Sequence, residues 1–188
     1  MIRIALVGNI ASGKSTVQNF LISRGYSVLD TDDTAHKLLE DSLEVKNVFK
    51  DYDVFENGAI SRVKLGQLIF SNKEMKTTLE NILHPLIRKE IEKFFNLNQD
   101  KKSVFVAIPL LFEAGMEDLF DKVLFVYTDD EIRLERLMKR NSYTREYAQI
   151  RMNSQISQDE KINKADYVIY NNSTIDELES QLVKLLNE

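Results

Sequence analysis

The chain has 188 residues, a formal net charge of −5 at pH 7, 43% hydrophobic and 29% charged residues, and no cysteine. These values are typical of one globular domain with a substantial core, and the absence of cysteine excludes disulfides, thiolate metal sites and cysteine nucleophiles. The negative charge argues against general nucleic-acid binding. No apolar run approaches the roughly 20 residues of a membrane span and no signal sequence is recognisable, so we expect a cytoplasmic protein that does not bind membranes.

Five short apolar runs rich in β-branched residues predict strands. Their hydrophobicity is continuous rather than alternating, which is typical of strands covered on both faces in a parallel sheet. The runs are IRIALV at 2–7, YSVL at 26–29, SVFVAI at 103–108, KVLFVY at 122–127 and DYVIY at 166–170.

Helical patterns separate these runs. They cover 16–24, which stops at Gly25, then 131–140 and 175–186. Strands that alternate with helices predict an α/β fold with a doubly wound, five-stranded parallel sheet.

The connection between the second and third strands is far longer than the few residues that usually link such elements. It reads as helical throughout, with Ser61 as a candidate N-cap and with two helices meeting at a bend where Pro85 disfavours helical geometry at His84. We therefore predict a helical insertion at 33–100 that recognises the substrate, within a core formed by 1–32 and 101–188.

The octapeptide GNIASGKS at 8–15 matches the phosphate-binding pattern G-x-x-x-x-G-K-[ST] without a mismatch. Its glycines let backbone N–H groups turn inward around an anion, and the following helix adds the partial positive charge of its N-terminus. In such P-loops the lysine, here Lys14, reaches the β- and γ-phosphates, and the hydroxyl of Ser15 is placed to bind Mg²⁺. The loop predicts ATP and Mg²⁺ as ligands.

Three carboxylates follow the second strand, at Asp30, Asp32 and Asp33. Ligands of parallel α/β sheets bind beyond the carboxyl ends of the strands, so this cluster is expected to face the loop. A kinase needs a carboxylate to accept or orient the proton of the acceptor hydroxyl. We assign that role to Asp32 and the role of helix cap to Asp33; Asp30 and Asp32, two apart on an extended chain, are expected to point the same way.

The most basic part of the chain follows the fourth strand, and we expect it to form a mobile lid at about 138–157. Arg133, Arg136 and Arg140 are spaced to share one helix face, with Arg133 expected in solvent. P-loop phosphotransferases need cations over the transferring phosphoryl group. Arg140 is the first candidate for this clamp, with Arg136 and Arg145 as alternatives.

The third strand runs into IPLLFEAG, where Leu110 is expected in the core. Glu113 at the end of this run either contacts Mg²⁺ through water or pairs with a lid arginine, and the residues alone do not separate these options. His84, taken by itself, reads as a cap or surface residue.

The assembled motifs resemble those of the dephospho-coenzyme A kinase family over nearly the whole chain. The shared segments are the P-loop, D-T-D at 30–32, H-P-L-I at 84–87, P-L-L-F-E at 109–113, K-R-N…T-R-E in the lid, and A-D-Y-V-I-Y-N-N at 165–172. The resemblance implies transfer of the γ-phosphate of ATP to the 3′-hydroxyl of the ribose of dephospho-CoA, the last step of coenzyme A synthesis.

The resemblance also implies the roles of individual residues. Asp32 is the base, Arg140 is the lid arginine, and Asn171 lies near the adenine. The residues implied to bind the ATP phosphates are Ala11, Ser12, Gly13, Lys14, Ser15 and Thr16. The residues implied to bind the acceptor are His84, Pro85, Leu111, Phe112 and Glu113, besides Asp32.

Two residues depart from the loop of the family, which reads G-G-I-G-S-G-K-S. Asn9 and Ala11 replace two of its glycines. Asparagine tolerates left-handed backbone angles better than most residues, whereas alanine does not. The change at Ala11 therefore bears on the local geometry of the loop.

Other readings remain open at this stage. P-loop kinases of nucleoside monophosphates, shikimate, gluconate or uridine share the loop and the lid, although a long helical insertion suits a larger acceptor. A GTPase switch requires a guanine-reading N-K-x-D, and N-K-A-D does occur at 163–166, but before a strand rather than after one. The oligomeric state is not indicated.

Overall fold

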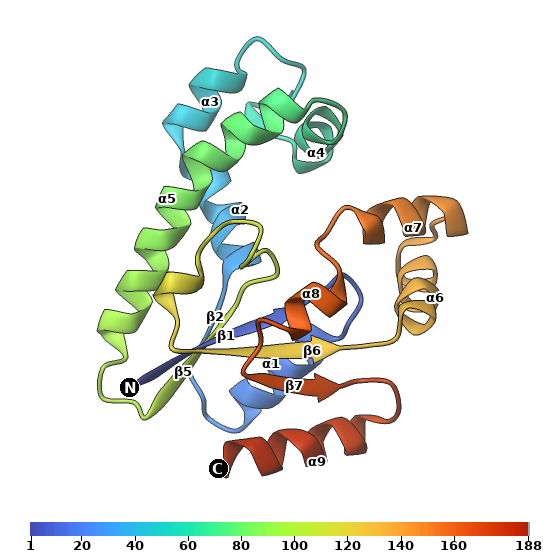
Figure 1. Ribbon diagram of the computed structural model, residues 1–188. Coiled ribbons are helices and arrows are strands. Elements are labelled where there is room, and N and C mark those ends of the chain that lie inside the picture. The colour runs from blue at the N-terminus through green and yellow to red at the C-terminus, as the bar shows by residue number, and fades with distance from the viewer. Residues whose placement is uncertain (188) are drawn as a thin grey trace. The chain divides into compact units, whose positions relative to one another are not determined.

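The computed structural model describes residues 1–187 (Figure 1). The chain forms two compact units. One contains Met1–Asp30 together with the chain from Phe95 onward, and the other contains Thr31–Phe94.

The first unit is built on a parallel sheet of five strands in the order β2-β5-β1-β6-β7 (Figure 1). The strands are β1 (Ile2–Gly8), β2 (Val28–Asp30), β5 (Ser103–Ala107), β6 (Lys122–Tyr127) and β7 (Tyr167–Tyr170). The prediction of an α/β fold with a five-stranded parallel sheet is confirmed. β1 lies in the middle, and its last residue, Gly8, opens the phosphate-binding loop.

Helices cover this sheet, which explains why its strands are continuously apolar. The helices are α1 (Lys14–Ser23), α6 (Asp130–Asn141), α7 (Arg145–Asn153), α8 (Gln158–Ile162) and α9 (Ile175–Leu186), with a 3₁₀ turn at Glu117–Leu119.

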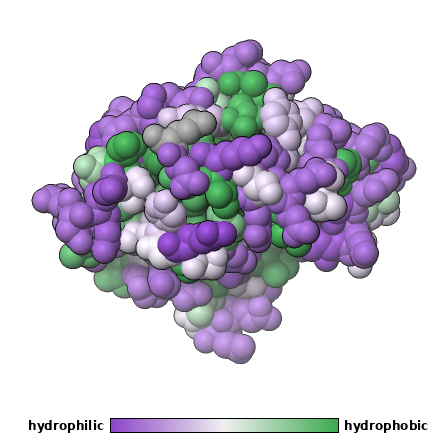
Figure 2. All heavy atoms as spheres, turned by 90° about the horizontal axis from the view of Figure 1, so that it is seen from below, coloured by the Kyte–Doolittle hydropathy of each residue, from purple (hydrophilic) through white to green (hydrophobic). Residues whose placement is uncertain are grey.

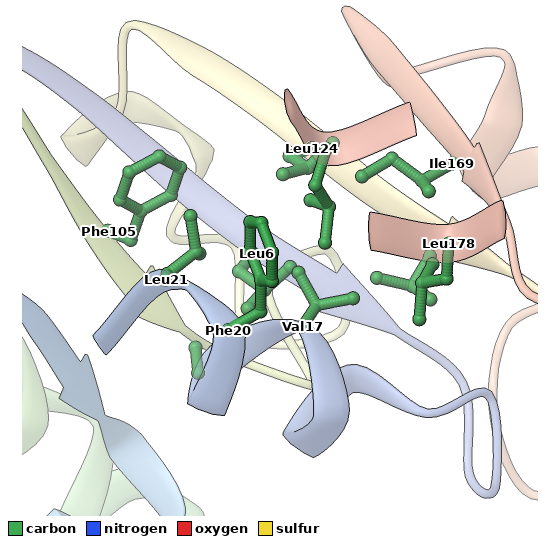
Figure 3. Close-up of a cluster of buried hydrophobic side chains, with 11 residues drawn as sticks. Leu6, Val17, Phe20, Leu21, Phe105, Leu124, Ile169 and Leu178 are labelled. Carbon is green, nitrogen blue, oxygen red and sulfur yellow. The ribbon is translucent and has the colours of Figure 1, made fainter. Parts of the chain in front are cut away.

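Helices α1 and α9 pack on one face of the sheet (Figure 3). Leu6 of β1 meets Val17 and Leu21 of α1, and Leu178 of α9 closes the cluster beside Ile169 of β7. Each such side chain contributes about 1.5–3 kcal/mol by leaving water. This packing anchors the strand before the phosphate-binding loop and the helix after it.

The second unit is mainly helical. Its elements are α2 (Thr31–Asp41), α3 (Leu43–Phe49), β3 (Phe55–Glu56), β4 (Ala59–Ile60), α4 (Arg62–Ser71) and most of α5 (Lys73–Leu97). A core of its own includes Val45, Phe49, Leu65 and Leu79.

Two predictions for this unit are wrong. Residues 55–60 form a β-hairpin rather than helix, with Asn57 and Gly58 at φ 50° and 80°; Asn-Gly is the typical two-residue hairpin turn, a signal that the helical interpretation overlooked. Moreover, α5 runs unbroken through Pro85. Pro85 lies on an exposed face, where water can bond the backbone carbonyl that the proline leaves without a donor.

The face seen in Figure 2 is mostly hydrophilic, with small separate apolar areas. Such scattered apolar side chains are normal for a protein surface. Within residues 1–187, no helix combines the length and the apolar character needed to cross a membrane.

Candidate active site

The phosphate-binding loop connects the central strand β1 to α1, and two of its residues have left-handed backbone angles. Ala11 has φ 63° and Gly13 has φ 91°. Left-handed residues among right-handed ones turn successive N–H groups toward one side, which forms an anion-binding concavity. The amides that open α1, at Lys14 and Ser15, add donors, because the first amides of a helix have no intrahelical acceptor.

Both outer glycines of the loop are required by close neighbours. A Cβ atom at Gly8 would collide with the hydroxyl of Ser12, and one at Gly13 would collide with Nδ2 of Asn171. At Gly13 the left-handed φ adds strain to any side chain.

Asn171, expected near the adenine, supports the loop directly. Its Nδ2 donates to the carbonyl oxygen of Ser12 at 2.8 Å, and the hydroxyl of Thr128 donates to the same oxygen at 2.8 Å. Both side chains are buried. The residues that directly follow β6 and β7 therefore hold the loop at Ser12.

The basic helix α6 passes beside the loop. Arg136 donates to the carbonyl oxygen of Asn171 at 3.1 Å, and one of its nitrogens lies 3.9 Å from the position of a Cβ on Gly13. Arg140 is exposed one turn further on, where its Nε donates to Asn141 at 2.9 Å. The structure thus brings Arg136 to the loop and leaves Arg140 at the end of α6, next to Ser142 with its left-handed φ of 54°.

Two other arginines of this segment are already paired. Arg145 contacts Glu131 at 2.8 Å on the surface. Arg133 is only 3% exposed, so the expectation that it lies in solvent is wrong. Its Nε donates to the carbonyl oxygen of Ile10 at 3.0 Å and its Nη1 pairs with Asp130 at 2.7 Å, partners that a buried guanidinium needs.

The segment after β5 is arranged differently from the expectation. Leu111 and Phe112, implied to bind the acceptor, are buried, whereas Leu110, expected in the core, is 40% exposed. The chain turns from Pro109 onward, and within this turn the side chains of Leu111 and Phe112 are buried while that of Leu110 is exposed.

Glu113 forms an ion pair, but with Lys161 of α8 and not with a lid arginine. The two side chains meet at 2.8 Å, and the same carboxylate oxygen accepts the N–H of Ile156 at 3.2 Å. Lys161 is fully buried and also approaches the carbonyl oxygen of Pro109 at 3.4 Å. Sequence reasoning missed Lys161, because it stands in a polar stretch that reads as surface.

The second unit carries Asp32 and His84. Helix α2 begins at Thr31, directly after β2, so Asp32 and Asp33 both lie in its first turn. Two expectations are therefore wrong: Asp33 is not the cap in front of the helix, and Asp30 and Asp32 do not follow an extended alternation. Asp32 is exposed.

His84 lies in α5 and is partly buried. This burial lowers the pKa of its imidazole below the usual range, against a smaller opposing effect of the Glu80 carboxylate. The neutral ring is therefore the main form at neutral pH.

The tetrapeptide N-K-A-D at 163–166 has a structural role. The carboxylate of Asp166 accepts the N–H of Val123 and pairs with Lys122, both at 2.8 Å. These contacts fix the start of β6. The phosphate-binding loop lies at the other ends of the strands, since Gly8 is level with Val126. A role in reading guanine is therefore not supported.

Comparison with known proteins decides the family. A family model described as dephospho-CoA kinase matches residues 2–177. The chain belongs to the dephospho-CoA kinase family. A curated dephospho-CoA kinase from Geobacillus kaustophilus is 41% identical over 191 residues, which cover 98% of this chain and 95% of that protein.

Solved structures agree with the dephospho-CoA kinase assignment. A crystal structure of a protein from Thermus thermophilus has a TM-score of 0.86 at 36% identity, covering 99% of this chain and 96% of that one. The dephospho-CoA kinase from Campylobacter jejuni has a TM-score of 0.76 at 36% identity, with the same coverage. The predicted family and kinase activity are confirmed, and the reaction of a dephospho-CoA kinase is the last step of coenzyme A biosynthesis.

Proposed function

We propose that residues Ala11–Thr16 hold the phosphates of ATP and that Asp32 receives the proton of the 3′-hydroxyl of dephospho-CoA. The observation that carries the proposal is the phosphate-binding loop, with left-handed Ala11 and Gly13 between the central strand and α1. Such a loop binds a polyphosphate end-on, and Lys14 adds a positive charge for the β- and γ-phosphates.

The position of Asp32 along the chain supports its role. β2 ends at Asp30, which is level with Leu6 of β1 at two strand spacings, or about 10 Å. Asp32 follows Asp30 by two residues, a reach of at most about 7 Å. The covalent chain therefore limits how far Asp32 can lie from the end of β2.

Mg²⁺ is proposed to be held by the phosphates and by the hydroxyl of Ser15, which is exposed in the first turn of α1. In residues 1–187 no three His, Asp or Glu side chains gather as a metal cage of their own. A magnesium ion bound mainly by phosphates and water needs few protein ligands. When bound there, it would neutralise charge on the transferring phosphoryl group.

The helical insertion at 33–100 is proposed to bind the acceptor. His84 and Pro85, within α5, and the segment Leu111–Glu113 are the proposed contacts. The pairing of Glu113 with buried Lys161 supports a rigid position for that carboxylate. A small-molecule acceptor, no nucleic acid and a cytoplasmic location remain predictions.

The acceptor assay tests this function. With Mg-ATP, the protein should release ADP rapidly with dephospho-CoA and at least about 100-fold more slowly with AMP, shikimate or gluconate, since one missing hydrogen-bonded group in a polar site has this scale of effect. The measurement is coupled ADP release at equal acceptor concentrations. Equal rates with all four acceptors would defeat the assignment.

The lid arginine has a test of its own. Arg140→Ala should lower kcat on the order of 100-fold, since a cation over the phosphoryl group stabilises charge that spreads in the transition state. Lys139→Ala, which removes the neighbouring exposed charge of α6, is the control and should stay within about threefold. A fully active Arg140→Ala variant would move the clamp to Arg136, which already lies beside the loop.

A further inference from the structure

Ala11 occupies a backbone conformation that alanine does not favour. At φ 63° its Cβ crowds the backbone, whereas the glycine of the family loop would adopt the same angles without this cost. A strained residue persists only where its surroundings fix both neighbouring peptide groups. The contacts around Ala11 therefore indicate what maintains the geometry of the loop.

Both backbone groups of Ile10, the residue before Ala11, are bound by side chains, one from α6 and one from the segment after α7. The N–H of Ile10 donates to Oε1 of Gln155 at 2.7 Å, and its carbonyl oxygen accepts from Arg133 at 3.0 Å. After Ala11, the N–H of Ser12 donates to the carbonyl oxygen of Asn9 at 3.0 Å. Arg133 and the carbonyl oxygen of Asn9 thus hold the peptide groups on either side of Ala11, and Gln155 holds the peptide group before them, between Asn9 and Ile10.

Gln155 belongs to the segment that leaves the lid helix α7, and this segment is joined to the loop twice. Besides the bond to Ile10, the side-chain nitrogen of Asn9 donates to the carbonyl oxygen of Ile156 at 2.9 Å. Asn9 is the other residue that departs from the family loop. Gln155 is partly exposed, unlike buried Arg133, so it can be replaced with less damage to the core.

We propose that Gln155 is a positioning residue for the nucleotide phosphates. Its carboxamide fixes the N–H of Ile10, so that the carbonyl of Ile10 stays directed at Arg133, Ala11 remains left-handed and the loop keeps its anion-binding shape. The inference rests on the proposed role of residues 11–16 in binding ATP. Gln155 acts through Ile10 and does not need to touch the nucleotide.

The test is a double-mutant cycle that compares ADP dissociation constants by calorimetry. Gln155→Ala should weaken ADP binding about 10-fold in the Ala11 protein, and less than about threefold when combined with Ala11→Gly, because glycine needs no external support at this angle. Gln155→Met, which keeps the length of the side chain but has no carbonyl oxygen, should weaken binding as much as Gln155→Ala.

Kinetics and a control separate positioning from general destabilisation. KM for ATP should rise with the ADP dissociation constant while KM for dephospho-CoA stays unchanged. Gln149→Ala removes an exposed amide of α7 that donates to Asn153 and should alter neither constant.

Three outcomes would overturn the proposal: equal losses in the Ala11 and Ala11→Gly backgrounds, full affinity in Gln155→Met, or a parallel rise of both KM values. If the unaltered protein itself does not bind ADP, the result contradicts both the proposed role of the loop and this inference. Additive losses in a protein that binds ADP overturn the inference about Gln155 alone.

Discussion

Replacing Asp32 with asparagine should lower kcat by about 10³-fold and leave the dissociation constant of ADP within about threefold. Asparagine keeps the shape of the side chain but cannot accept the proton of the attacking hydroxyl. The proposed phosphate-binding residues are untouched, since Asp32 belongs to the first turn of α2 and not to residues 11–16. Steady-state kinetics with dephospho-CoA and calorimetry with ADP measure the two quantities.

Asp33→Asn is the matched control for this experiment. Asp33 is exposed in the same first turn of α2, so both replacements remove one negative charge from the same helix end. Any effect of that charge on the stability of α2 appears in both variants. Unchanged turnover in Asp32→Asn, or an equal loss in Asp33→Asn, would remove Asp32 from the mechanism.

Removing Glu113, the more accessible partner of buried Lys161, should lower the free energy of unfolding by about 3–5 kcal/mol, because it leaves a buried charge without its counter-ion. In Glu113→Leu the ammonium group of Lys161 remains fully buried and keeps only the carbonyl oxygen of Pro109, at 3.4 Å, among the contacts described above. A loss of this size is a large fraction of the 5–15 kcal/mol that typically stabilise a domain. Urea denaturation of each variant gives the change.

The double variant separates stability from activity. Glu113→Leu combined with Lys161→Met removes both charges, so most of the lost stability should return, whereas turnover should stay low because the proposed acceptor contact is still absent. The exposed pair Arg145–Glu131 has the same 2.8 Å separation and serves as the control. Glu131→Leu should change stability little; a similar loss at both pairs would contradict the effect of burial.

The sequence by itself determined the sheet and the phosphate-binding loop. Each strand is a continuous apolar run, and the loop is defined by two glycines, a lysine and a serine within eight residues. Both signals are local, because strand burial and loop conformation depend on residues that are close along the chain. Asn57-Gly58 is an equally local signal for a hairpin turn. It was overlooked because the segments on both sides of it have helical patterns.

Only the tertiary structure decided which charged residues are buried. Lys161 and Arg133 stand among polar residues and read as surface, yet their partners Glu113 and Ile10 lie 48 and 123 residues away in the sequence. The local sequence also failed to predict the structure at Pro85. The preference of proline would end the helix there, yet α5 continues, and Ile82 and Leu86 on either side of Pro85 pack into the core of the second unit. A charge can be buried wherever the fold supplies a partner, and that partner is fixed by packing between distant segments rather than by neighbours in the chain.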